Sequence, residues 1–126
     1  MKIIIDTIPH SQQRYPTCGD WQWLDGGEVL FIRVSKLSDW RYEILIAIHE
    51  LIETVLCKND GDVESDVDAF DIAYEKQRAP GDESEPGDSP RAPYRRQHLI
   101  ATGIEKILAA ELGVDWKAYD KEVVNL

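Results

Sequence analysis

The sequence predicts an α+β protein, in which a small antiparallel sheet of about three strands packs against three or four helices. Two observations favour this class. β-branched runs around a turn signal fill the first third of the chain, and helical periodicity fills most of the rest. With 126 residues, 43% of them hydrophobic, the chain is long enough to bury one core. Residues 1–126 are therefore expected to form a single domain.

Three segments of the first third carry strand signals. Lys2–Ile8 is a short β-branched run, and the segments 21–24 and 28–34 flank Asp25-Gly26-Gly27, which is typical of a hairpin turn. Both faces of 28–34 are apolar near the middle, which places this strand at the centre of the sheet. The two tryptophans of the first hairpin arm either pack under a helix or stay exposed and support a dimer.

Four helical segments are expected after the sheet, at residues 40–58, 63–77, 94–112 and 115–123. The first begins after a capping residue, Ser38 or Asp39, and ends at Asn59-Asp60-Gly61. Between the second and third segments, residues 79–93 contain four prolines and two glycines. That composition excludes a helix and indicates a long surface loop.

The charge distribution limits the partners that the chain can have. The formal net charge is −10, and residues 60–88 contain eleven acidic and two basic residues. Such a surface repels a phosphate backbone, so unselective binding to nucleic acid is not expected. No apolar run approaches the roughly 20 residues that span a bilayer, and the acidic start is untypical of a signal peptide. A cytoplasmic protein with reduced cysteines is expected.

One helical run, Ile44–Cys57, is apolar except for a few side chains, three of which ionise: His49, Glu50 and Glu53. A helix that is apolar nearly all round belongs in a core, where charges must be paired or bound to a metal. His49 and Glu53 are four residues apart and share one helix face, whereas Glu50 is rotated by about 100°. The run predicts either a divalent-metal site or a polar network in which His49 and Glu53 pair with each other or with an arginine.

The segment His49-Glu50-Leu51-Ile52-Glu53 resembles the His-Glu-x-x-His helix of the zincin metallopeptidases, and this resemblance covers residues 28–57. It implies a zincin-like fold, zinc held by His49 and Glu53, and Glu50 as the general base that takes a proton from water. Glu53 stands where the zincins have their second histidine. A carboxylate at that position also admits iron or manganese.

A third metal ligand must come from elsewhere in the chain, and His98 on the third helical segment is the first choice. The other candidates are His10, Asp68, Asp71 and Glu105. Glu105 is alternatively expected as a hydrogen-bond partner of His98. In a hydrolytic reaction, Tyr94 or an arginine such as Arg91 is expected to stabilise the developing oxyanion.

Three further segments, 67–71 (Val-Asp-Ala-Phe-Asp), 86–94 (Pro-Gly-Asp-Ser-Pro-Arg-Ala-Pro-Tyr) and 110–116 (Ala-Glu-Leu-Gly-Val-Asp-Trp), resemble a family of uncharacterised phage and prophage proteins. The resemblance spans residues 40–120. It implies a phage- or prophage-encoded protein in a bacterial cytoplasm and carries no known activity.

The residues leave three functions open. The leading one is a metal-binding protein with a zincin-like helix, acting as a hydrolase on a peptide or another amide. The second is a non-enzymatic interaction protein that uses its acidic stretch and proline-rich loop, with a structural His49–Glu53 pair. The third is a Mg²⁺-dependent nucleotide phosphohydrolase, whose ion would be held by four carboxylates: Glu50, Glu53, Asp68 and Asp71.

Overall fold

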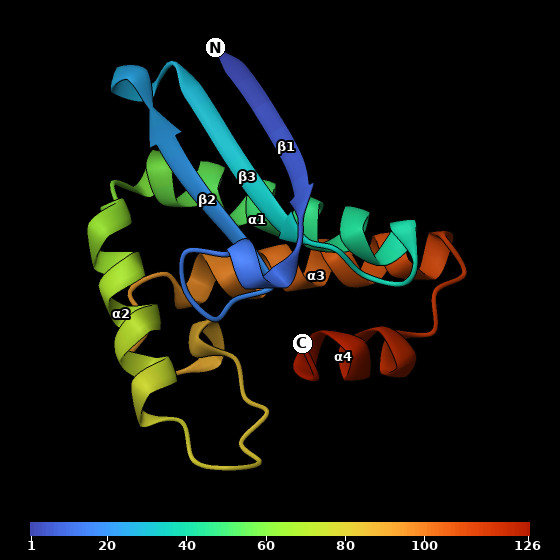
Figure 1. Ribbon diagram of the computed structural model, residues 1–126. Coiled ribbons are helices and arrows are strands. Elements are labelled where there is room, and N and C mark those ends of the chain that lie inside the picture. The colour runs from blue at the N-terminus through green and yellow to red at the C-terminus, as the bar shows by residue number, and fades with distance from the viewer.

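The computed structural model describes all 126 residues, and its class is α+β (Figure 1). Three strands come first, β1 (Lys2–Ile8), β2 (Gly19–Leu24) and β3 (Val29–Ser35). Four helices follow, α1 (Trp40–Asp60), α2 (Glu64–Gln77), α3 (Arg95–Glu111) and α4 (Trp116–Val124). Short 3₁₀ turns at His10–Gln12, Asp25–Gly27 and Pro86–Asp88 complete the secondary structure. The expected strand and helix segments are confirmed to within a few residues.

The sheet is mixed, so the prediction of an antiparallel sheet was wrong. Its strand order is β1-β3-β2, with β2 antiparallel to β3 and β1 parallel to β3. The hairpin was predicted correctly, and β3 is central as expected. Because β3 returns between the two earlier strands, it lies beside a strand that runs in its own direction. A hairpin signal cannot predict that placement, since it fixes only the pairing of neighbouring strands.

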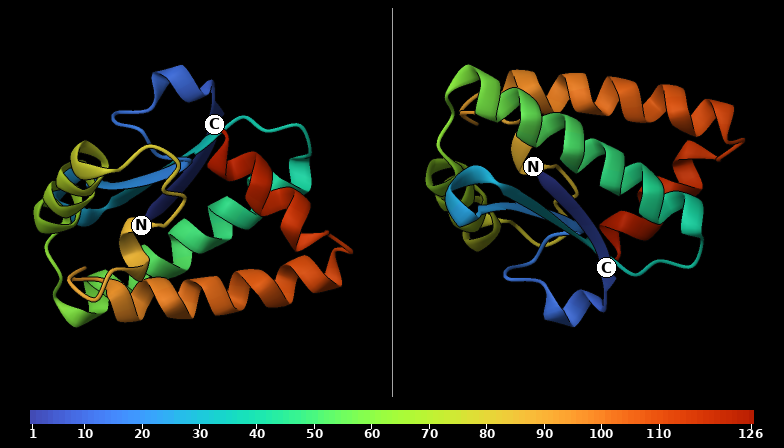
Figure 2. Two further views of the ribbon diagram at one scale, coloured as in Figure 1. Left: turned by 90° about the horizontal axis from the view of Figure 1, so that it is seen from below. Right: turned by 90° about the horizontal axis from the view of Figure 1, so that it is seen from above.

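Helix α1 lies between the sheet and α3, as Figure 2 shows from two sides. One side of α1 packs on the buried row of β3, Leu30, Ile32 and Val34, which are at most 1% exposed. The helix is not buried all round, because Ile44 and Val55 are exposed on its outer side. Its ends are as predicted: the side chain of Asp39 caps the first turn, and Gly61 ends the helix in the left-handed conformation.

The two tryptophans of β2 pack under α1, which resolves the alternative that the sequence left open. Trp21 is buried, and the indole N–H of Trp23 donates to the hydroxyl of Thr54 over 2.9 Å. Helix α2 is only partly buried, because Val67 is its one buried residue and Val63 at its start is exposed. None of the helices is both long and apolar enough to cross a bilayer.

Candidate metal centre

Three potential ligand atoms converge between α1 and α3. His49 Nε2 lies 3.3 Å from Glu53 Oε2 and 3.2 Å from His98 Nδ1, and His98 Nδ1 lies 3.1 Å from Glu53 Oε2. All three residues are buried. The i, i+4 spacing brings His49 and Glu53 together on α1, and the antiparallel packing of α3 against α1 adds His98.

The distances between the three atoms match those between the ligand atoms of a bound metal ion. In a tetrahedral zinc site with bonds of about 2.1 Å, two ligand atoms lie about 3.4 Å apart. The three sides, 3.1–3.3 Å, are close to that value. Two imidazole nitrogens and one carboxylate oxygen suit zinc, iron and manganese. The residues present therefore fit a divalent ion with one side of its coordination sphere left to other ligands.

The second nitrogen of His49 is held by a buried carboxylate. His49 Nδ1 donates to Glu105 Oε2 over 2.8 Å, and the other oxygen of Glu105 accepts from the hydroxyl of Tyr119. Since an ionised carboxylate only accepts, Nδ1 carries a proton, and Nε2 is the ring nitrogen that faces Glu53 and His98. This carboxylate–histidine arrangement is the usual outer partner of a metal-bound imidazole. Glu105 thus accepts a hydrogen bond from His49, and the expectation that it would pair with His98 was wrong.

The second nitrogen of His98 faces the loop before α3. Glu85 Oε2 lies 2.9 Å from His98 Nε2 and Asp88 Oδ1 lies 3.5 Å away, so both carboxylates are within ion-pair distance of this nitrogen. Gly87 packs on the imidazole, where an added Cβ would come within 2.3 Å of the ring. The loop therefore fixes the ring by close contact and presents two exposed carboxylates to its outer nitrogen.

The carboxylate and the two imidazoles of the triangle favour one another's charged forms. Burial raises the pKa of Glu53, but hydrogen bonds from His49 and His98 outweigh it and lower that pKa to about 2. Burial lowers the pKa of His98, yet Glu53 and Glu85 raise it to about 9. The pKa of His49 is likewise raised, because its bonds to Glu105 and Glu53 outweigh its burial. Protons therefore occupy this site in the metal-free protein, and a metal ion would have to displace them.

Glu50 follows His49 on α1 but faces the cavity without a partner. Its carboxylate makes no hydrogen bond or ion pair. Burial and the neighbouring charge of Glu53 raise its pKa well above the ordinary value. The backbone of β2 passes so close that a Cβ on Gly19 would lie 2.4 Å from Glu50 Oε1. A half-buried carboxylate with a raised pKa beside a potential metal site is suited to general-base work.

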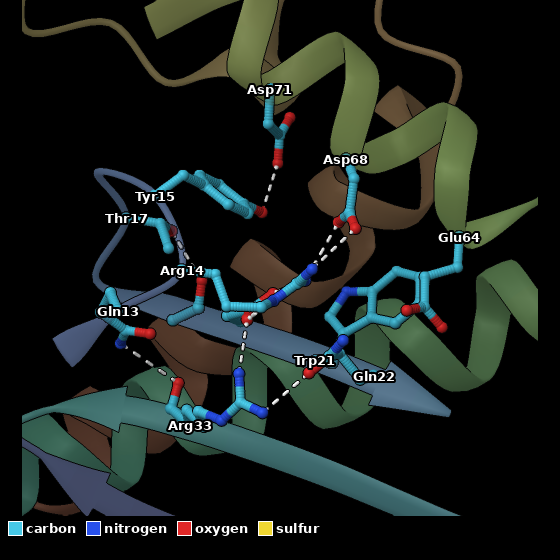
Figure 3. A network of polar contacts seen from close by, with 12 residues as sticks. Gln13, Arg14, Tyr15, Thr17, Trp21, Gln22, Arg33, Glu64, Asp68 and Asp71 are labelled. Atoms are coloured by element: carbon cyan, nitrogen blue, oxygen red, sulfur yellow. Dashed lines mark hydrogen bonds and ion pairs between the residues drawn. The ribbon is translucent and has the colours of Figure 1, made fainter. Parts of the chain in front are cut away.

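Tyr94 also lines the cavity, but its hydroxyl is engaged. It donates to Asp71 Oδ1. Tyr15 donates to the other oxygen of Asp71, Oδ2, over 3.4 Å, a contact that Figure 3 shows. Burial, partly offset by the bond from Tyr94, raises the pKa of Asp71 to about 7. Tyr94 can donate a hydrogen bond towards a ligand only when its hydroxyl is released from Asp71. Arg91, the other expected oxyanion partner, is exposed and does not line the cavity.

A cavity of about 350 Å³ opens in front of these residues. Its walls come from the segment before β2, from α1, α2, α3 and α4, and from the loop before α3. His49, Glu50, Glu53 and His98 all lie on its surface. The volume lies within the range of small-ligand pockets, so a ligand has room to reach the histidine–glutamate triangle.

The remaining candidates have other partners. Asp68 pairs with Arg14 over 3.0 Å, and His10 Nδ1 lies 3.0 Å from the hydroxyl of Ser35. The four carboxylates expected for a magnesium site, Glu50, Glu53, Asp68 and Asp71, do not come together as a group that could hold a metal ion, because only Glu53 belongs to such a group, with His49 and His98. Cys57 is buried in the core and both cysteines are free.

Sequence reasoning missed three residues that hold the site in shape. Trp21 Nε1 donates to Glu53 Oε1 over 3.3 Å, Tyr119 holds Glu105, and Glu85 faces His98. They come from β2, α4 and the proline-rich loop, far from His49 in sequence. Comparison with known protein families, with curated proteins and with solved structures returns no match for this chain.

Proposed function

We propose that the protein binds one divalent metal ion, with zinc as the best fit, through His49, Glu53 and His98. The observation that carries the proposal is the triangle of three ligand atoms 3.1–3.3 Å apart. The carboxylate of Glu105 on the outer nitrogen of His49 supports it. The buried environment supports it too, because removing three ionisable groups from water is costly unless they are paired or metal-bound.

The chemistry that we propose for the site is hydrolysis of a peptide or another amide. A bound ion supplies Lewis acidity and acidifies a water molecule. Glu50 is the base that accepts the water proton, because it lies on the same cavity wall and has no other partner. Tyr94 stabilises negative charge on the substrate oxygen when its hydroxyl is released from Asp71. The resemblance to zincin metallopeptidases agrees with these roles.

A pair of variants tests this function. The zinc-loaded protein should cleave members of a mixed library of short peptides, and Glu50→Gln should lower the rate by about 10²–10⁴-fold while keeping the metal. Glu111→Gln, an exposed change outside the cavity, serves as the control. Cleavage by the chelator-treated protein, or equal cleavage by the Glu50 variant, would contradict the assignment. Bound metal with no cleavage of any peptide would leave a metal-binding protein without the proposed hydrolysis.

A further inference from the structure

The cavity in front of the proposed metal centre is lined by many more carboxylates than the one that belongs to the centre. Eleven of the chain's acidic residues line it, whereas Arg78 is its only lysine or arginine. Several of these carboxylates are neutralised within the protein. Arg14 and Arg33 pair with Asp20, and Arg78 pairs with Glu75 over 2.6 Å. The charge that remains after this pairing decides which ligands the cavity accepts.

Four carboxylates of the lining have no cationic partner. Asp71 is bonded only to tyrosines, and Glu50, Glu83 and Asp120 have no hydrogen bond or ion pair. They come from four different elements, α2, α1, the loop after α2 and α4, and so surround the cavity from several sides. Burial raises the pKa of Asp120, and the carboxylates of Glu85 and Glu83 raise it further. All four carboxylates therefore line one cavity without an arginine, lysine or histidine that pairs with them.

A bound divalent ion would not cancel this charge. Around the ion, Glu53, Glu105 and Glu85 contribute three carboxylates, and the histidines are neutral when they act as ligands. Two positive charges leave that group negative, before the carboxylates of the outer wall are counted. A positively charged ligand group beside the metal would relieve the repulsion, whereas a ligand carboxylate would add to it.

We propose that the cavity selects ligands carrying a primary ammonium or guanidinium group. This selectivity rests on the metal site proposed above. The positive group lies between Glu83 and Asp120, while the reacting amide faces His49, Glu53 and His98. In substrate terms, the favoured class is a cationic amine or a peptide with lysine or arginine next to the scissile bond. The exposure of both outer carboxylates allows such a group to enter from solvent.

Three metal-binding probes that differ only at one end of the molecule test this selectivity. Aminohexanohydroxamate ends in an ammonium, heptanohydroxamate in a methyl group, and adipic monohydroxamate in a carboxylate. Titration calorimetry on the zinc-loaded protein at low salt should give the ammonium probe an affinity about fivefold above the methyl probe. The carboxylate probe should bind more weakly than both. Raising the ionic strength should reduce these differences.

A double variant, Glu83→Gln with Asp120→Asn, should remove most of the preference for the ammonium probe and leave the methyl probe unchanged. The matched control, Asp6→Asn with Glu111→Gln, changes the net charge equally on exposed residues outside the cavity and should keep the preference. Equal binding of all three probes would overturn the proposed selectivity and leave the metal site intact. Failure of every probe to bind, or undiminished binding to His49→Ala, would overturn both proposals.

Discussion

Two groups of carboxylates line the same cavity, and they are neutralised in different ways. In the first, Glu53 and Glu105 contact only histidines, a tryptophan and a tyrosine. In the second, Arg14 binds Asp20 through two bonds of 2.6 Å and continues to Asp68 (Figure 3). Arginine keeps its charge at every accessible pH, whereas histidine can exchange its proton for a metal ion. The arginine network is therefore permanent, and the histidine cluster is open to exchange.

The difference teaches how to separate a structural ion pair from a candidate metal site in one molecule. Each cluster contains a buried carboxylate, Glu53 in one and Asp20 in the other, so neither burial nor charge tells the clusters apart. The residue type that pairs with the carboxylates, arginine or histidine, does tell them apart. Arg14 and Arg33 tie the segment before β2 to α2 and β3, whereas in the histidine cluster two imidazole nitrogens face one another and the carboxylate of Glu53.

The largest effect is expected from removal of the arginine. Arg14→Met leaves Asp20, which is 2% exposed, with only the longer contact from Arg33 at 3.5 Å. A buried carboxylate that loses its partner typically costs about 3 kcal/mol or more in the free energy of unfolding. Urea denaturation measures the loss. Adding Asp20→Asn to the variant should recover part of it, and a single variant within about 1 kcal/mol of the parent would contradict a structural role.

The second prediction concerns metal-dependent stability. Zinc at a hundredfold excess over its dissociation constant should raise the free energy of unfolding by about 2.7 kcal/mol. His49→Ala should abolish that increment, while Arg14→Met should keep it despite its lower stability. Thermal unfolding with and without zinc gives both values. If zinc stabilised the two variants equally, the two clusters would not differ as described.

A smaller effect is expected from the outer partner of His49. Glu105→Gln removes the negative charge that orients the imidazole, and such changes typically weaken metal binding about 10–100-fold. Competition with a zinc-chelating dye measures the affinity, and Glu111→Gln is the matched control on the same helix. Unchanged zinc affinity in the Glu105 variant would mean that this carboxylate only supports the fold.

The last prediction concerns the pH dependence of stability at Asp71. Its folded-state pKa is raised to about 7, from about 3.9 in the unfolded chain. A group whose pKa is raised by folding contributes stability at low pH that is lost as the pH rises through the folded pKa. Stability should therefore fall between about pH 4 and 7 by an amount on the order of 1–3 kcal/mol. Asp71→Asn should flatten that part of the profile, and an unchanged slope would contradict the assignment.

The sequence predicted the parts of the site that depend on local geometry. His49 and Glu53 are four residues apart on a helix, so their convergence follows from helical periodicity alone. His98 was selected from a short list of histidines, and the packing of α3 on α1 places it as expected. The predicted hairpin also formed, because its turn residues lie between the two arms that they join.

The remainder depends on contacts between distant segments, which no local pattern encodes. The parallel pairing of β1 with β3 follows from the insertion of β3 between two earlier strands. Trp21, Glu85 and Tyr119 reach the site from three separate elements. The partner of Glu105 was assigned to the wrong histidine, because spacing on α3 suggested His98 and packing between the helices brings in His49.

The most direct test of the central claim is X-ray absorption at the zinc edge of the zinc-loaded protein, at one ion per chain. We predict a first shell of nitrogen and oxygen at about 2.0–2.1 Å, with scattering from two imidazoles. In His98→Gln, the variant that leaves α1 unchanged, the scattering should fall to that of one imidazole. A spectrum without imidazole scattering, or one that is identical in the variant, would contradict a metal centre formed by His49, Glu53 and His98.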